Sequence, residues 1–277
     1  MANSSARSSA TIRRAHPPAS KRRRWLAGGI AGVLLVAAGL AAAALIAVGP
    51  GHARRADSGG STPAGPTPRD WQTISDAFGA STIDIAVWYQ IYNGNNWTMA
   101  ERNGHLEFVF APDAAPGGVW NNFGGHVGTL CTFPGDFDAK VQFNLVRWPA
   151  GNGLEVTLTA FLGPENTWYQ AVRSSDPTGG EQYDSQTGFW SNYLVDTGDA
   201  GALRVTRRHG VITTYYLDRG RWVKMRSAPN AESAKIAVGV TGGANELRGK
   251  SAVVDFTNFS VASNDFDCPP NARPPSS

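Results

Sequence analysis

Hydrophobic and polar residues alternate most regularly between residues 137 and 147. A period of two over this length predicts a long strand with one face in a hydrophobic core. The apolar face carries Phe137, Ala139, Val141, Phe143 and Leu145. We expect the opposite, polar face to carry Asp138, Lys140, Gln142, Asn144 and Trp148. Turns over residues 134–136 and 149–153 bound this strand, and the second turn leads into another alternating segment.

Further strand-like segments follow one another along the chain, separated by turns rich in Gly and Pro. We predict strands over residues 74–78, 105–110, 119–133, 154–162, 168–173, 202–208, 211–217, 221–226, 235–240 and 251–261. The three between 202 and 226 form a β-meander with tight turns. Residues 181–199 read as a long loop with at most one short strand. The pattern predicts an all-β sandwich of two antiparallel sheets, since no amphipathic helix pattern appears outside residues 25–48.

Residues 25–48 form an uncharged run rich in Ala, Leu, Val and Gly. About 20 such residues suffice to span a bilayer as a helix. The first 24 residues hold seven Lys and Arg and no acidic residue, which places them on the cytoplasmic side. We therefore expect a single-pass cell-membrane protein with its N-terminus inside. The alternative is a secreted protein whose signal peptide is cleaved after Ala53.

The charge of the chain divides at the membrane segment. The basic tail, residues 1–24, leaves 18 Lys and Arg against 22 acidic residues in the rest of the chain. The exported part thus lacks the basic excess of a nucleic-acid binder, and we expect no nucleic-acid partner. Residues 49–70 read as a Pro/Gly/Ser-rich linker, residues 71–268 as an extracellular domain, and residues 269–277 as a disordered tail.

The two cysteines, Cys131 and Cys268, both lie in the exported part. An oxidising compartment allows them to form a disulfide, which would stabilise the fold by about 2–4 kcal/mol. A reactive thiol pair is the alternative, but neither cysteine has a neighbouring His or Lys, and there is no C-x-x-C. We predict the structural disulfide.

Several segments resemble the concanavalin A-like lectin/glucanase superfamily, the jelly roll of legume lectins, laminin G-like domains and laminarinase-type glycosidases. The resemblance covers about residues 71–262, and it is strongest to exported proteins of high-GC Gram-positive bacteria. It rests on residues 76–78, 97, 103–106, 134–138, 203–205, 215–216, 222, 237–240 and 254–261. It implies a jelly-roll fold and, for the enzymes, a Glu-x-Asp-x-x-Glu motif on one strand of the concave face.

The sequence lacks that carboxylate motif, so the resemblance does not extend to its catalytic residues. Glu155 stands on its strand face with Thr157 and Thr159, and Glu181 could approach it from another strand to form an atypical pair. Carbohydrate binding requires aromatic faces together with polar groups. The candidate ligand-binding residues are Trp148, Glu155, Trp168, Tyr169, Arg173, Glu181 and Tyr183, although aromatic residues of a β domain also serve the core.

Calcium is the one cofactor that the resemblance implies, because lectins and laminin G-like domains hold it between loops with carboxylates and carbonyls. The candidate ligands here are Asp136, Asp138 and Asp255, with Asn258; the alternative is that these side chains simply face solvent. The five histidines show no zinc-ligand spacing, and no G-x-S-x-G is present.

Three functions remain open. The first is a membrane-anchored, lectin-like domain that binds carbohydrate or another cell-surface ligand without catalysis. The second is a glycoside hydrolase or polysaccharide lyase with an atypical site. The third is a structural or protein-binding surface module.

Overall fold

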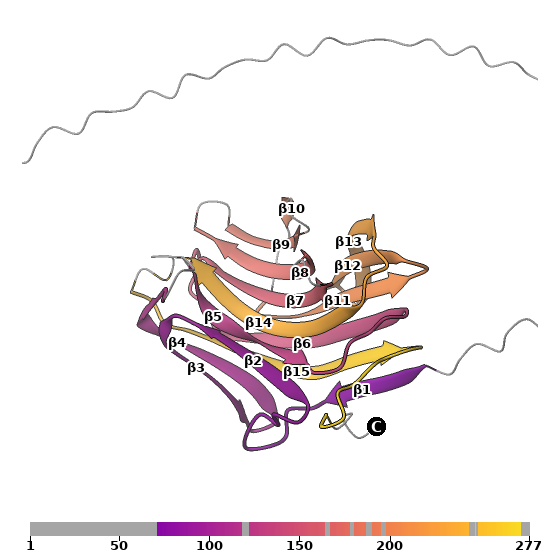
Figure 1. The fold of residues 1–277 in the computed structure, drawn as a ribbon. Coiled ribbons are helices and arrows are strands. Elements are labelled where there is room, and N and C mark those ends of the chain that lie inside the picture. Colours follow the sequence, from indigo (N-terminus) through magenta and orange to yellow (C-terminus); the bar gives the residue numbers. More distant parts are fainter. Residues whose placement is uncertain are drawn as a thin grey trace, which may run out of the picture. The chain divides into compact units, whose positions relative to one another are not determined.

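The computed structural model describes residues 71–117, 122–163, 167–177, 180–186, 198–243, 247 and 249–272, and the backbone of 190–194. Its strands form two antiparallel sheets that pack face to face (Figure 1). The predicted all-β, two-sheet sandwich is therefore confirmed. Residues 1–70 and 273–277, with the predicted membrane segment and linker, lie outside the described residues. Within the described part, no helix is long and apolar enough to cross a membrane.

The first sheet, sheet A, contains eight strands in the order β13-β12-β11-β6-β15-β4-β3, with β1 paired to β15. Its strands are β1 (Gln72–Asp76), β3 (Asn95–Arg102), β4 (His105–Ala115), β6 (Phe137–Arg147), β11 (Ala200–Arg208), β12 (Val211–Asp218), β13 (Arg221–Pro229) and β15 (Ala252–Ser263).

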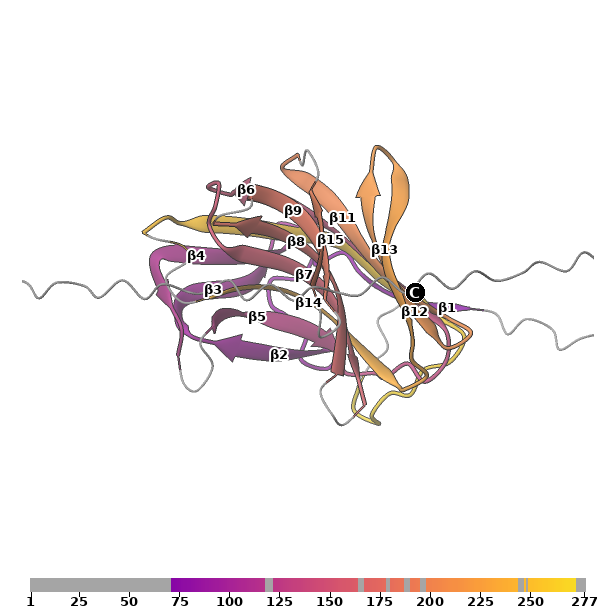
Figure 2. The ribbon, with the colours of Figure 1, turned by 90° about the horizontal axis from the view of Figure 1, so that it is seen from above.

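The second sheet, sheet B, contains seven strands in the order β10-β9-β8-β7-β14-β5-β2. Its strands are β2 (Trp88–Asn93), β5 (Asn122–Thr129), β7 (Leu154–Leu162), β8 (Thr167–Asp176), β9 (Gly180–Gln186), β10 (Trp190–Leu194) and β14 (Ala234–Gly243). Seen from above, β3 and β4 of sheet A lie in one layer and β2 and β5 of sheet B in the other (Figure 2).

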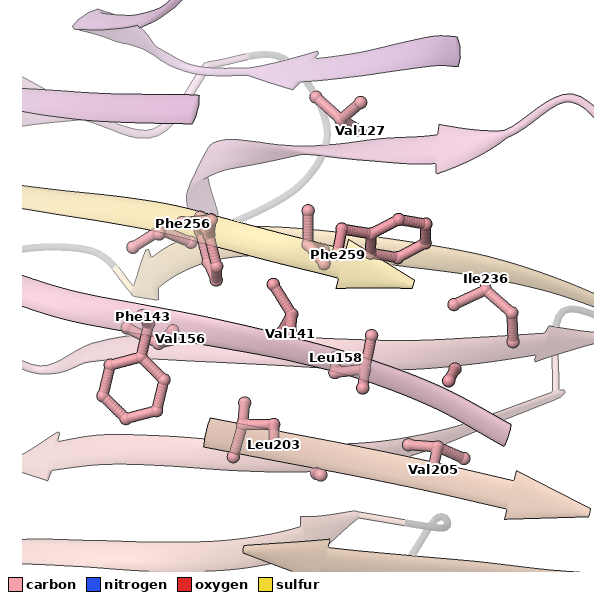
Figure 3. Close-up of a cluster of buried hydrophobic side chains, with 14 of the residues drawn as sticks. Val127, Val141, Phe143, Val156, Leu158, Leu203, Val205, Ile236, Phe256 and Phe259 are labelled. Carbon is pink, nitrogen blue, oxygen red and sulfur yellow. The ribbon is translucent and has the colours of Figure 1, made fainter. Parts of the chain in front are cut away.

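The hydrophobic core fills the space between the two sheets. The five apolar residues of the β6 face are all at most 3% exposed, as the alternation predicts. Figure 3 shows Val141 and Phe143 of β6 near Val156 and Leu158 of β7, with Phe256 and Phe259 of β15 beside them. Alternation therefore identified the buried face of the longest strand correctly.

The predicted meander is present as β11, β12 and β13, which pair in sequence. Its two turns have positive φ at His209 and Gly210 and at Arg219 and Gly220, the pattern of tight hairpin turns. The prediction of a loop over 181–199 was wrong, because β9 and β10 fall there and pair with each other. The strand β2 was not predicted, and it forms an edge of sheet B.

The strands β6 and β7 follow one another in sequence but belong to different sheets. The polar faces of β6 and β7 consequently point to opposite sides of the sandwich. Gln142 and Asn144 of β6 therefore do not share a face with Glu155 of β7. The prediction that Trp148 lies on the polar face of β6 was wrong, because Trp148 follows the end of β6 and packs against the hydrophobic core. The turn between the strands, residues 148–153, carries the chain from sheet A to sheet B.

The predicted disulfide between Cys131 and Cys268 is present, with Cα atoms 4.1 Å apart and 137 residues of sequence separation. It ties the segment after β15 to the connection between β5 and β6. Backbone hydrogen bonds between Thr132 and Asp267, 2.8 and 2.9 Å long, reinforce the same junction.

Candidate functional site

The outer face of sheet B is hollowed near β2, β5, β7 and β14. The strand register places Tyr89 beside Gly128, Ile91 beside His126, and Phe161 beside Lys235 on this face. Two adjoining hollows of about 440 and 270 Å³ share Ile91 and Phe161 in their walls. We call these two hollows together the sheet B groove. The larger hollow is lined by Tyr89, Ile91, Thr132, Phe161, Gly163, Ser233 and Lys235.

The ring of Tyr89 lies against β5 at Gly128. A Cβ added to Gly128 would fall 2.2 Å from the Tyr89 ring, so only glycine permits this approach. Burial raises the pKa of the Tyr89 hydroxyl to about 12, and the group stays protonated at neutral pH. The groove therefore has a flat aromatic wall.

His126 lines the smaller hollow and likewise lies against a glycine of the neighbouring strand. A Cβ on Gly239 would lie 2.4 Å from the imidazole, and the Phe161 ring meets that imidazole edge-on at 5.9 Å. Burial lowers the pKa of His126 to about 4, so the ring is uncharged at neutral pH. Its Nε2 atom is buried and has no hydrogen-bond partner among the described residues.

Polar side chains cover the same sheet face on β7, β8 and β9. Gln186 donates to both carboxylate oxygens of Glu155 at 3.3 Å, and Ser174 donates to Asp184 at 2.5 Å. Asp184 is fully buried, and desolvation raises the pKa of its carboxyl above the ordinary range. This part of the face is thus a hydrogen-bonded network beside the groove.

Two of the seven predicted ligand-binding residues lie on this outer face. Glu155 lies in the polar network, and Trp168, paired with Phe161, is 41% exposed. Tyr169 points the other way, where it packs against the hydrophobic core.

The other four predicted residues come together on the inner side of sheet B. Arg173 forms an ion pair with Glu181, and its guanidinium lies 5.9 and 5.8 Å from the ring centroids of Trp148 and Tyr183. The Trp148 indole donates to Glu181 at 3.0 Å, and Ser175 donates to the same carboxylate at 2.5 Å. The arrangement holds the turn over residues 148–153 against the sheet.

The suggested pairing of Glu155 with Glu181 was wrong. Glu155 pairs in register with Ser174, whereas Glu181 pairs with Ser175 on the next position of the same strand. Successive residues of a strand point to opposite faces, so the two carboxylates lie on opposite sides of sheet B.

The three aspartates proposed for calcium are not brought together. Asp138 accepts two hydrogen bonds from Arg204, at 2.8 and 2.7 Å, and Asp136 accepts from the His209 backbone. Asp255 pairs in register with Asn144, six residues along β6 from Asp138. Among the described residues, no group of three or more His, Cys, Asp or Glu has the geometry to hold a metal ion.

Sequence reasoning missed the residues that line the groove: Tyr89, Ile91, His126, Phe161 and Lys235. Phe161 had a signal, because period two places it with Glu155 on the otherwise polar face of β7. The glycines of β5 gave a second signal, since they alternate with His126 and leave room for rings to lie on the strand.

The chain was compared with known proteins. No protein-family model and no curated protein matches it. Among solved structures, a GlcNAcα1-4Gal-releasing endo-β-galactosidase from Clostridium perfringens aligns with a TM-score of 0.51 at 11% identity, over 73% of this chain and 65% of that one. An uncharacterised protein from Mycobacterium paratuberculosis gives 0.50 at 12% identity, over 68% and 98%.

A GH43 protein from Bacillus licheniformis gives a TM-score of 0.48 at 14% identity, and the chain spans only 39% of its length. At 11 and 12% identity, the two structures with TM-scores of 0.51 and 0.50 show a similarity of fold alone.

Proposed function

We propose that the domain binds carbohydrate in the sheet B groove without turning it over. The observation that carries this proposal is the flat Tyr89 ring over Gly128, next to Phe161 in a hollow open to solvent. Sugars bind proteins by stacking their C–H faces on aromatic rings while polar groups fix the hydroxyls.

Polar groups for the sugar hydroxyls lie in the adjoining smaller hollow. Asn93, Asn122 and Thr241 line the smaller hollow together with His126, and Trp168 is exposed on the same sheet face. Uncharged donors and acceptors of this kind suit hydroxyl groups, which both donate and accept hydrogen bonds.

The absence of catalysis in the proposal is supported by two observations. The sequence has no Glu-x-Asp-x-x-Glu, and Glu155 and Glu181 lie on opposite faces of the sheet. Glycoside hydrolysis in most families requires two carboxyl groups about 5–9.5 Å apart that flank one bond.

The test is a glycan-array screen of residues 63–277, which form one compact unit, together with a reducing-sugar assay on every hit. Tyr89→Ala and Phe161→Ala should each abolish or strongly weaken the array signal, whereas Trp148→Phe should not. Release of sugar would make the protein an enzyme. Silence across the array would instead favour a protein-binding surface module.

We also propose that residues 25–48 anchor the domain outside the cell, with the basic tail in the cytoplasm. The proposal rests on the uncharged run behind the cluster of Lys21 and Arg22 to Arg24. Protease treatment of intact cells should remove the domain and leave the membrane segment. A mature N-terminus after residue 53 would show cleavage and a secreted product.

A further inference from the structure

We infer that the glycan bound in the sheet B groove is acidic, with its anionic group at Lys235. This inference rests on the proposed function and names the ligand class of the same groove. It follows from the charges and donors that line the two hollows.

The larger hollow presents donors at one end. Lys235 lines it together with the hydroxyl residues Thr132 and Ser233, and no Asp or Glu is among its described lining residues. The Thr132 hydroxyl donates to the Asp267 carbonyl at 3.4 Å, so the Lys235 ammonium and the Ser233 hydroxyl are the donors that can bind a carboxylate or a sulfate.

The ammonium of Lys235 lies above the aromatic wall. Its Nζ is 5.4 Å from the centroid of the Tyr89 ring, and Lys235 is an exposed residue. None of the ion pairs among the described residues involves it. A sugar stacked on Tyr89 would therefore meet a cation that has no carboxylate partner in the described part of the chain.

The smaller hollow is uncharged. Its described lining residues are His126, which is neutral, and residues without an ionised side chain: Ile91, Tyr92, Asn93, Asn122, Phe123, Gly124, Gly125, Phe161 and Thr241. The two hollows adjoin, so a ligand that fills both would place its charged substituent at Lys235 and an uncharged sugar face at His126.

One carboxylate lies close enough to oppose this arrangement. A Cβ on Gly163, a residue of the larger hollow, would touch the carboxylate of Glu232. Glu232 is exposed and does not itself line the hollow. Its negative charge should weaken the binding of an anionic ligand. Replacing Glu232 should therefore raise the affinity for such a ligand, whereas replacing Lys235 should lower it.

The experiment is a titration of residues 63–277 with oligogalacturonates and with the same oligomers after reduction of their carboxyl groups to alcohols. Dextran sulfate oligomers and unmodified dextran form a second matched pair, which distinguishes sulfate from carboxylate. The variants are Lys235→Gln, Glu232→Gln and, as a control, Lys250→Gln, whose Nζ donates to Ala150 outside the groove.

We expect the acidic member of at least one pair to bind at least tenfold more tightly than its neutral partner. Lys235→Gln should remove this preference, Glu232→Gln should increase affinity for the acidic ligand a few-fold, and Lys250→Gln should change neither. Added salt should weaken binding of the acidic ligand.

Equal binding of acidic and neutral oligomers, or an unchanged preference in Lys235→Gln, would overturn the inference and leave the proposed function intact. Absence of binding to these oligomers and to every glycan of the array would overturn both.

Discussion

Tyr89 lies so close to Gly128 that a Cβ on the glycine would fall 2.2 Å from the Tyr89 ring. The two residues are register partners on β2 and β5, so the aromatic wall of the groove depends on a missing side chain in the neighbouring strand.

Gly128→Ala should therefore displace the Tyr89 ring from the strand. Because Tyr89 is only half-buried, the ring can turn outward, and we expect glycan affinity to fall about tenfold or more with a loss of stability near 1 kcal/mol. Isothermal titration and thermal unfolding measure the two effects. Gly79→Ala is the control, because nothing lies within 4 Å of a Cβ added to Gly79. Normal glycan binding by Gly128→Ala would show that the position of the Tyr89 ring does not depend on Gly128.

Glu181→Gln should lower stability and leave glycan binding unchanged. The substitution removes the charge that faces the buried guanidinium of Arg173, and breaking such a pair costs about 1–3 kcal/mol at a partly exposed site. Thermal unfolding and the same binding titration separate the two outcomes. If affinity fell while stability held, the inner cluster would be part of the ligand site.

Asp138→Asn should destabilise sheet A by about 1–3 kcal/mol. Asp138 is 8% exposed and accepts both hydrogen bonds from Arg204, with Lys140 and Arg208 each 3.7 Å away. Without the carboxylate, three cations remain around one site. Chemical denaturation measures the loss, and it should be smaller at high salt, where repulsion among the cations is screened. If calcium raised the Tm of the parent domain but not that of Asp138→Asn, Asp138 would be a metal ligand instead.

Replacing both Cys131 and Cys268 with Ser should lower the free energy of unfolding by about 3–5 kcal/mol, because the disulfide closes a loop across 137 residues of sequence. Equilibrium denaturation of the parent and the double variant measures the difference. Reduction of the parent protein should give a similar loss, and a stability unaffected by reduction would mean that the bond does not form in the protein.

Glu101→Gln should raise the Tm at pH 8 by about 2–4 °C, the shift for about 1 kcal/mol in a domain of this size. Burial, with a smaller contribution from Asp76, raises the pKa of the Glu101 carboxyl to about 7 in the folded protein. The folded state thus binds more protons than the unfolded state between about pH 4.5 and 7, so this contribution to stability falls as pH rises through that window.

The pH profile of the parent supplies the check. The difference in Tm between Glu101→Gln and the parent should be small near pH 4.5 and grow up to about pH 7. A difference that does not vary with pH would contradict the raised pKa.

Local pattern sufficed for much of the fold. The alternation from Phe137 to Leu145 identified the buried face of β6, because side-chain direction in a strand follows from position alone. The same rule separates Leu106, Phe108 and Phe110, all fully buried, from the other face of β4. The disulfide could also be predicted from the sequence, since the chain contains only two cysteines.

What only the tertiary structure decided is which sheet each strand joins. The turn over residues 148–153 takes the chain from β6 in sheet A to β7 in sheet B, and the alternation on either side is the same whichever sheet a strand enters. The sequence by itself therefore determined the all-β class and the buried faces. The groove needed the sheet order, because Tyr89, His126, Phe161 and Lys235 come from four strands whose proximity depends on long-range pairing.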